Sequence, residues 1–211
     1  MRCSSSALLR LTMALAVFVA GACVDNASLT APSDDSAPVT IPPMFDETPV
    51  QTLSGGMIVK RTNVLNADII VTQTITPDGG WIAIPDAGFY MYFPRGAVSE
   101  PLSVTATAHK GNKVVYSFEP HGTHFNAPVY MAQLLRYTEL NTPRNRKTQI
   151  PWYGYMPDGL ADVNDDGTAE FAEIFNAEYY GKGNETYALG NTTHFSGYAL
   201  ASGRRDPNDK Q

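Results

Sequence analysis

A histidine, an aromatic residue and a serine follow one another at His194, Phe195 and Ser196, near the end of the chain. A serine hydroxyl can attack the carbonyl carbon of the preceding residue when a nearby base removes its proton and the peptide is strained. Here Ser196 would attack the Phe195 carbonyl, His194 would act as the base, and water would hydrolyse the resulting ester. The alternative is a plain terminal strand in which Phe195 packs inward while His194 and Ser196 face outward. The triplet is therefore a candidate self-cleavage site.

An acidic segment from Asp162 to Glu173 fits the calcium-loop pattern D-x-[DN]-x-[DN]-G-x5-E at every specified position. Side-chain oxygens of Asp162, Asn164 and Asp166 can converge on one hard cation, and a bidentate Glu173 would close the site. Calcium is the only cofactor that the sequence suggests. The segment lacks the amphipathic helices that flank such loops, so a solvated and empty hairpin turn is the alternative.

Two further sets of residues invite a binding interpretation. His121 and His124, with His109, are candidate metal ligands, but no third ligand stands at a recognised spacing, so we do not expect a metal there. A second set would form a sugar-stacking platform if exposed, although aromatic residues are more often buried in a core; its members are Trp81, Trp152, Tyr153 and Tyr155. The chain contains no G-x-S-x-G, no H-E-x-x-H and no phosphate-binding loop, which favours a non-catalytic protein.

Strands must position these residues, because apolar and polar residues alternate with a period of two along much of the chain. Gly and Pro, at 17 and 15 residues, recur too closely for long helices, and we expect no helix after the N-terminal segment. The pattern predicts an all-β, antiparallel domain with a turn at residues 77–80. The expected strands cover residues 69–75, 102–108, 114–118, 129–137, 150–155, 170–180, 187–189 and 195–201.

Several short motifs occur in a specific order: GG at 79–80, FPRGAV at 93–98, FEPHG at 118–122, FNAPV at 125–129 and THFSGY at 193–198. In order and spacing they resemble a ZU5 domain, a β-module of ankyrins, netrin receptors, death-domain scaffolds and bacterial envelope proteins. The resemblance covers residues 68–201 and accounts for His121 and His124 as turn residues. It implies an antiparallel β-sandwich that serves protein contact or spacing rather than metabolism. Some ZU5 domains cleave themselves before the serine of a His-hydrophobic-Ser triplet.

The N-terminus has the pattern of an export signal. Arg2 and Arg10 precede the uncharged, apolar residues 11–22, a run too short to span a bilayer as a helix. The run ends in VAGAC at residues 19–23, which resembles the bacterial lipobox, whose cysteine becomes the lipidated first residue of the mature protein. Residues 1–22 are therefore predicted to be a lipoprotein signal peptide.

Cys23 is the predicted lipidation site. Cys3 and Cys23 are the only cysteines, so the mature chain would keep a single thiol, which lipidation explains. Ala20 stands where Leu is commoner in the lipobox, and ordinary cleavage near Ala22 is the alternative. Val24 is not the Asp that retains enterobacterial lipoproteins at the inner membrane, so we expect the outer membrane of a bacterial cell envelope.

Composition divides the remaining chain. Residues 23–50, rich in Ser, Asp, Ala, Thr and Pro, read as a flexible tether. Residues 51–202 would form the ZU5-like β-sandwich, and residues 203–211 a polar tail.

The charge of the chain restricts its partners. The formal net charge is −6, which argues against a nucleic-acid partner because phosphate binding requires clustered Lys and Arg. We expect a membrane, contacted through the lipid anchor, and an envelope protein or glycan as partners.

Overall fold

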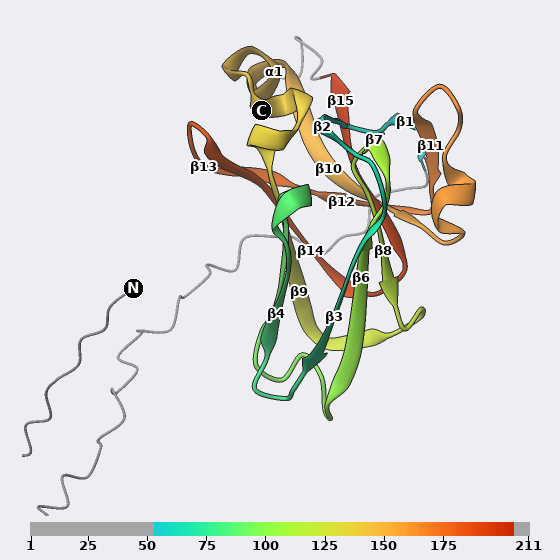
Figure 1. Cartoon of the computed structure of the whole chain (residues 1–211), viewed down its shortest axis with the longest axis vertical. Helices are drawn as coiled ribbons and strands as arrows, with labels where there is room; N and C mark the ends of the chain where they lie inside the picture. Colours follow the sequence, from blue (N-terminus) through green and yellow to red (C-terminus); the bar gives the residue numbers. More distant parts are fainter. Residues whose placement is uncertain (1–52, 205–211) are drawn as a thin grey trace, which may run out of the picture. The chain divides into compact units, whose positions relative to one another are not determined.

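The computed structural model describes residues 53–204 (Figure 1). Apart from one six-residue α-helix and four short 3₁₀ turns, every regular element in this range is a strand. The strands pair antiparallel throughout both large sheets. The predicted all-β, antiparallel fold is therefore confirmed.

Two sheets form the body of the domain, with β4 and β9 on one side and β6 and β8 on the other (Figure 1). The larger sheet has six strands, in the order β12 (Glu173–Asn176), β10 (Gln149–Met156), β15 (Gly197–Arg204), β8 (Val115–Glu119), β6 (Leu102–Ala108) and β3 (Ile69–Ile75). The smaller sheet has five strands, in the order β13 (Glu178–Lys182), β14 (Glu185–His194), β9 (His124–Leu134), β5 (Phe89–Phe93) and β4 (Gly80–Ile84).

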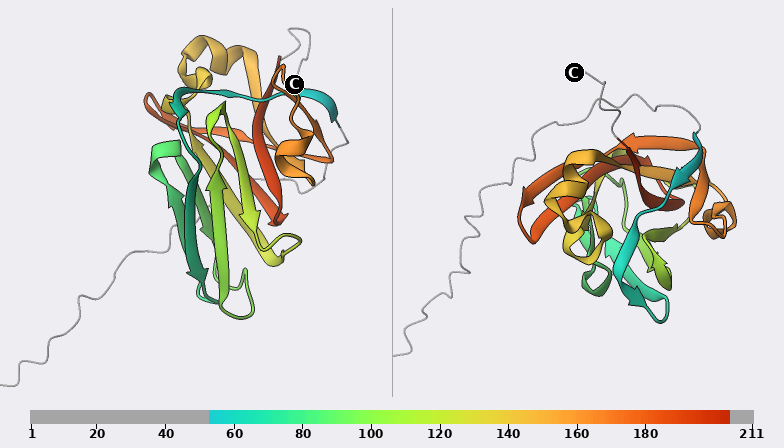
Figure 2. Two further views of the ribbon diagram at one scale, coloured as in Figure 1. Left: turned by 45° about the vertical axis from the view of Figure 1, so that its right-hand side comes forward. Right: turned by 90° about the horizontal axis from the view of Figure 1, so that it is seen from above.

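Smaller elements border the two sheets. Two short ribbons pair β1 (Leu53–Met57) with β11 (Thr168–Phe171), and β2 (Lys60–Leu65) with β7 (Gly111–Lys113). The helix α1 (Pro143–Thr148) lies at one end of the sandwich (Figure 2). The 3₁₀ turns are η1 (Pro85–Ala87), η2 (Leu135–Tyr137), η3 (Glu139–Asn141) and η4 (Gly159–Asp162).

The main core lies between the sheets and is rich in aromatic side chains. The Phe89 ring of the five-stranded sheet stacks on the Tyr116 ring of the six-stranded sheet, with centroids 4.1 Å apart. The Phe118 and Phe195 rings stack at 5.1 Å, and Phe125 meets Phe195 edge-on at 4.6 Å. Burial of such rings is the main favourable contribution to folding, so these contacts join the two sheets.

A second apolar cluster lies on β10, β11 and β15 around Trp152 and Phe171, whose rings meet edge-on at 4.9 Å. Gly154 of β10 permits this packing, because a Cβ atom at this position would lie 1.9 Å from Cδ1 of Phe171. The ribbon of β1 and β11 thus packs against one part of the larger sheet.

The observed elements differ from the predicted ones: β1, β2, β4, β5 and β7 were not among the predicted strands, and β14 extends beyond residues 187–189 at both ends. The predicted strand 170–180 is three strands, because the chain leaves the larger sheet after β12 and joins the smaller one at β13. β9 begins at His124 rather than at residue 129, so it includes Pro128. Its hydrogen-bonded neighbour β14 has a register shift against it between Thr192 and His194. Thr142 caps α1, a helix that the sequence did not predict, by accepting a hydrogen bond from the Asn145 N–H. β15 extends to Arg204, two residues into the predicted polar tail.

Candidate functional site

Strand β5 places apolar side chains on its inner face and tyrosines on its outer face. Phe89, Met91 and Phe93 point into the core and are at most 1% exposed. Tyr90 and Tyr92 alternate with them on the opposite face and are half-buried. Side chains of a strand point to opposite faces in turn, so the segment FYMYF places one aromatic set inside and another outside.

An aromatic row crosses the outer face of the five-stranded sheet. Tyr92 pairs with Trp81 on β4 and with Tyr130 on β9, and Tyr130 pairs with Asn191 on β14. Ring centroids are 4.5 Å apart for Trp81 and Tyr92, and 6.4 Å apart for Tyr92 and Tyr130, with interplanar angles of 36° and 28°. We call Trp81, Tyr92 and Tyr130 the aromatic row. Trp81 is 61% exposed.

A second outward row runs beside the first. Ala83, Tyr90, Ala132 and Leu189 pair in sequence across the same four strands. Neither outward row contains an acidic or basic side chain across β4, β5, β9 and β14 of the described sheet. The face is therefore uncharged over both rows.

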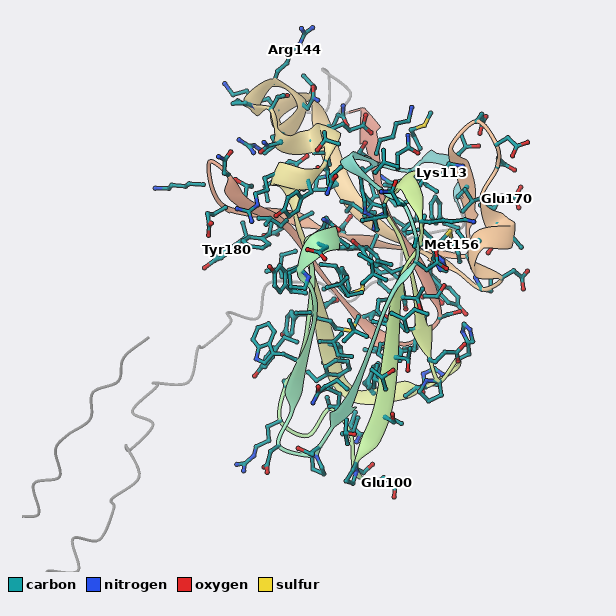
Figure 3. The ribbon with its side chains drawn as sticks, viewed as in Figure 1. Glu100, Lys113, Arg144, Met156, Glu170 and Tyr180 are labelled. Atoms are coloured by element: carbon teal, nitrogen blue, oxygen red, sulfur yellow. The ribbon has the colours of Figure 1, made fainter. Side chains whose placement is uncertain are left out.

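Charged residues border this face on the side of β13. Tyr187 meets Tyr90 edge-on at 6.2 Å, and burial raises the pKa of Tyr187, with Glu185 contributing. Arg136 donates a hydrogen bond to the Tyr137 hydroxyl at 2.9 Å, and this bond raises the pKa of Arg136. Tyr180 of β13, also 61% exposed, projects outward at this border (Figure 3).

The aromatic platform considered from the sequence is not formed, because only Trp81 among its four members is exposed and the commoner use of such residues, burial, holds for Trp152 and Tyr153. Trp152 is 8% exposed. The Tyr153 side chain is fully buried and donates to the Ala188 carbonyl at 3.0 Å, and burial raises its pKa well above the ordinary value. Tyr155 packs against His194. Sequence reasoning missed Tyr92 and Tyr130, although the alternation of Phe and Tyr in FYMYF was a usable signal for an aromatic outer face.

His194 lies at the end of β14, between β12 and β15. Its Nε2 atom is 3.3 Å from a carboxylate oxygen of Glu173 on β12, and its Nδ1 atom is 3.2 Å from the Tyr198 hydroxyl on β15. The Tyr155 ring packs edge-on against the imidazole at 4.7 Å, and the His194 side chain is 14% exposed. Burial raises the pKa of Tyr198, which keeps its hydroxyl protonated as a donor to the His194 carbonyl at 2.7 Å. The imidazole is therefore held on both nitrogens.

The rest of the triplet lies in the link to β15. Phe195 is buried, as predicted, but Ser196 is also buried at 4% exposure, so the alternative with Ser196 facing outward is wrong. The Ser196 hydroxyl donates to the Pro157 carbonyl at 3.4 Å, and no hydrogen bond among the described residues joins it to His194. The Phe195 carbonyl accepts a hydrogen bond from the Gly122 N–H at 3.1 Å. A donor thus faces the carbonyl oxygen that would become negative during attack by Ser196.

Most side chains of the predicted calcium loop bond to neighbouring residues. The Asp162 carboxylate accepts the Asp158 N–H at 3.0 Å. One oxygen of Asp166 accepts the N–H and the hydroxyl of Thr168 at 2.9 and 2.7 Å, and these bonds lower the pKa of Asp166. The Asn164 amide donates to the Thr168 hydroxyl at 3.0 Å. These bonds shape a compact acidic turn.

Glu173, the predicted closing ligand, lies on β12 with its carboxylate against His194 rather than in this turn. Within residues 53–204, no group of three or more His, Cys, Asp or Glu side chains could hold a metal ion. The structure thus joins Glu173 to the other candidate site, the triplet. Calcium binding stays a prediction.

The remaining histidines occupy separate surroundings. The His121 ring lies against the Glu119 carboxylate, with Nε2 and Oε1 2.8 Å apart. The ring of His124 lies 5.9 Å from the ring of His194. His109 bonds through Nε2 to the Ser117 hydroxyl at 2.7 Å. The three rings therefore lie in different surroundings.

His109 borders a hollow of about 340 Å³ beside β7, which Lys110, Lys113 and Leu160 help to line. Burial lowers the pKa of His109, although the nearby Asp68 carboxylate opposes this effect. The imidazole serves as a hydrogen-bonding group to Ser117.

Comparisons with known proteins assign no family to this chain. No family model matches it, and neither does any curated protein. The ZU5 resemblance therefore stays a prediction, and the site must be interpreted from its own geometry.

The lipidation and signal predictions concern residues outside the described range, because Cys23 and residues 1–50 lie before it. Within the described part of the chain, no helix has the length and hydrophobicity needed to cross a membrane.

Proposed function

We propose that this protein is a lipid-anchored β-sandwich module of a bacterial cell envelope, located at the outer membrane. In this proposal it is non-catalytic and makes protein or glycan contacts at the membrane surface. The observation that carries the proposal is the aromatic row on an uncharged outer sheet face. Trp and Tyr combine a large apolar area with a polar group, which makes them frequent in contact surfaces.

The exposed indole of Trp81 supports a contact role. At 61% exposure it remains largely hydrated, and removing apolar area from water contributes about 25 cal/mol per Å². Large contiguous exposed apolar patches are uncommon on monomeric soluble proteins and mark interaction sites. A partner that covers the row therefore gains free energy that the isolated domain does not realise.

A pulldown from envelope extracts tests the contact function. Full-length protein purified in detergent is immobilised, and the retained protein and glycan are quantified for the wild type and for Trp81→Ala. We expect Trp81→Ala to lose most of the retained material. Tyr180→Ala, which alters a side chain of the same exposure at the border of the face, is the matched control and should retain it. Equal retention by all three proteins would contradict a role for the row.

The membrane anchor has its own test. Each buried acyl methylene contributes about 0.8 kcal/mol, so several acyl chains on Cys23 would hold an acidic protein at a bilayer. Cells fed a labelled fatty acid should yield a labelled protein, and Cys23→Ser should abolish the label. An unlabelled wild type would remove the anchor from the proposal and leave the contact face intact.

Self-cleavage is the second candidate function, and the Gly122 N–H on the Phe195 carbonyl favours it. The Ser196 oxygen would bond to the Phe195 carbonyl carbon while the bond between that carbon and the Ser196 nitrogen breaks. The hydroxyl proton would pass to the released amine, and water would then hydrolyse the ester to an acid and a free hydroxyl. His194 would have to turn from Glu173 towards Ser196 to take part as a base.

Intact mass spectrometry of the purified protein shows whether the chain cleaves itself. Cleavage predicts a fragment that begins at Ser196, and Ser196→Ala should abolish it. A single uncleaved species, stable over days, would exclude this second function and leave the contact function untouched.

A further inference from the structure

We propose that the aromatic row binds a neutral polysaccharide, with pyranose rings packed against Trp81, Tyr92 and Tyr130. This inference rests on the proposed contact function and names the chemical class of the partner. A pyranose whose hydroxyls are equatorial presents C–H groups on its faces, and such a face packs against an aromatic ring. The same sugar needs hydrogen-bonding groups around its rim.

The geometry of the row suits an extended chain. Its three rings come from three adjacent strands, and neighbouring strands lie about 4.8 Å apart. One sugar residue of an extended polysaccharide has a similar length, so successive sugars can meet successive rings. The row starts at β4, the edge of the sheet, so at that end a long polymer can extend past the row without meeting a further strand of this sheet.

Polar side-chain groups that have no hydrogen-bond partner among residues 53–204 accompany the rings. The hydroxyls of Tyr92 and Tyr130 and the side-chain amide of Asn191 form no hydrogen bond within the described part of the chain. Asn191 pairs directly with Tyr130, so its amide extends the row by one strand. An amide offers two donor hydrogens and one acceptor oxygen, and each tyrosine hydroxyl can donate and accept. These groups match the hydroxyls of a sugar.

Charge complementarity selects a neutral polymer. The two outward rows contain no acidic or basic side chain, whereas the chain as a whole has a net charge of −6. An anionic polysaccharide would find no cation in the row and would be repelled by the protein. A peptide that extends the sheet would bind the free edge of β4 through backbone groups and would not need the three rings.

Affinity electrophoresis in native gels tests the proposal. Full-length protein is kept in a polyoxyethylene detergent, which has no sugar headgroup, and is run through gels that contain one polymer each. The neutral panel is hydroxyethylcellulose, xyloglucan, galactomannan, starch and dextran; the anionic panel is alginate and polygalacturonate. We expect retardation by at least one neutral polymer, lost in Trp81→Ala and kept in Tyr180→Ala.

Tryptophan fluorescence gives an independent readout. Trp81 and Trp152 are the only tryptophans, and Trp152 is buried against Phe171. The retarding polymer should therefore change the emission of Trp81, and no change should remain in Trp81→Ala. Tyr92→Ala should weaken binding about tenfold, because one stacking contact is lost.

The outcomes separate this inference from the function on which it rests. If no neutral polymer retards the protein, but envelope material is still retained through Trp81 in a protease-sensitive manner, the partner is a protein and the glycan assignment is overturned. Retardation only by anionic polymers, abolished by salt, would also overturn it. If Trp81→Ala changes neither retardation nor retention, both the inference and the contact function fail.

Discussion

The two faces of the five-stranded sheet use aromatic residues for different ends. The inner face holds Phe89 and Phe93, which pack into the core at 1% exposure or less. The outer face holds Trp81, Tyr92 and Tyr130, whose rings touch one another with no second layer over them among the described elements. The inner rings have no polar atom, and every ring of the row has one. Aromatic content alone therefore says nothing about role, whereas the face of the strand to which a ring points decides whether it is buried or free for contact.

Truncating an inner ring should have the largest effect. Phe89→Ala removes a ring stacked on Tyr116 at 4.1 Å and leaves a cavity between the sheets. We expect the free energy of unfolding to fall by about 3–5 kcal/mol, measured by urea denaturation. Tyr92→Ala, on the outer face of the same strand, should cost far less. Similar losses for the two variants would contradict the division between the faces.

A buried tyrosine of the core should make the protein sensitive to alkali. Burial raises the pKa of Tyr116 from 10.0 to about 12, so the native state keeps this proton at pH values where the unfolded state has lost it. This stabilisation is complete below pH 10 and is lost as the pH rises through the folded pKa. Tyr116 alone should account for a loss of about 2–3 kcal/mol between pH 10 and pH 12, measured by denaturation at each pH.

The control for this effect is Tyr116→Phe. The variant loses the hydrogen bond to the Gln133 side chain and is less stable at neutral pH, by about 1–3 kcal/mol. Its disadvantage should shrink as the pH rises, since it has no proton to lose. Parallel pH profiles for the two proteins would show that Tyr116 does not titrate differently on folding.

The smallest effect on stability is expected in the row itself. Trp81 is 61% exposed, so Trp81→Ala should change the free energy of unfolding by about 0.5 kcal/mol or less. Acrylamide should quench the wild-type fluorescence in two phases, because Trp152 is shielded and Trp81 is open. In Trp81→Ala only the shielded phase should remain. A large loss of stability would mean that Trp81 is a structural residue rather than part of a contact surface.

Period-two alternation was enough to predict the fold class and several strands. The strands at residues 69–75 and 102–108 were predicted with their observed bounds, because apolar and polar residues alternate along much of each. The switch between sheets at Ala177 could not be predicted, because alternation describes the faces of a strand and not the sheet to which it belongs. The helix α1 was missed because six residues are too few to show a helical period.

The site could be predicted only in part, because its residues come together through pairing between strands. Trp81 was recognised as a candidate for sugar stacking, but Tyr92 and Tyr130 join it only through the register of three strands. Glu173 was assigned to a calcium loop from local spacing, whereas the fold places it against His194, 21 residues away in sequence. Such contacts depend on tertiary structure that a linear motif does not contain.

The alternation of inward and outward side chains in β5 also limits which insertions this strand can tolerate. Inserting one residue between Phe89 and Tyr92 would turn the following side chains over, exposing phenylalanine and forcing tyrosine hydroxyls into the core. An insertion of two residues would preserve the sidedness of the strand. A single-residue insertion in β5 would therefore disrupt the core and the aromatic row at the same time.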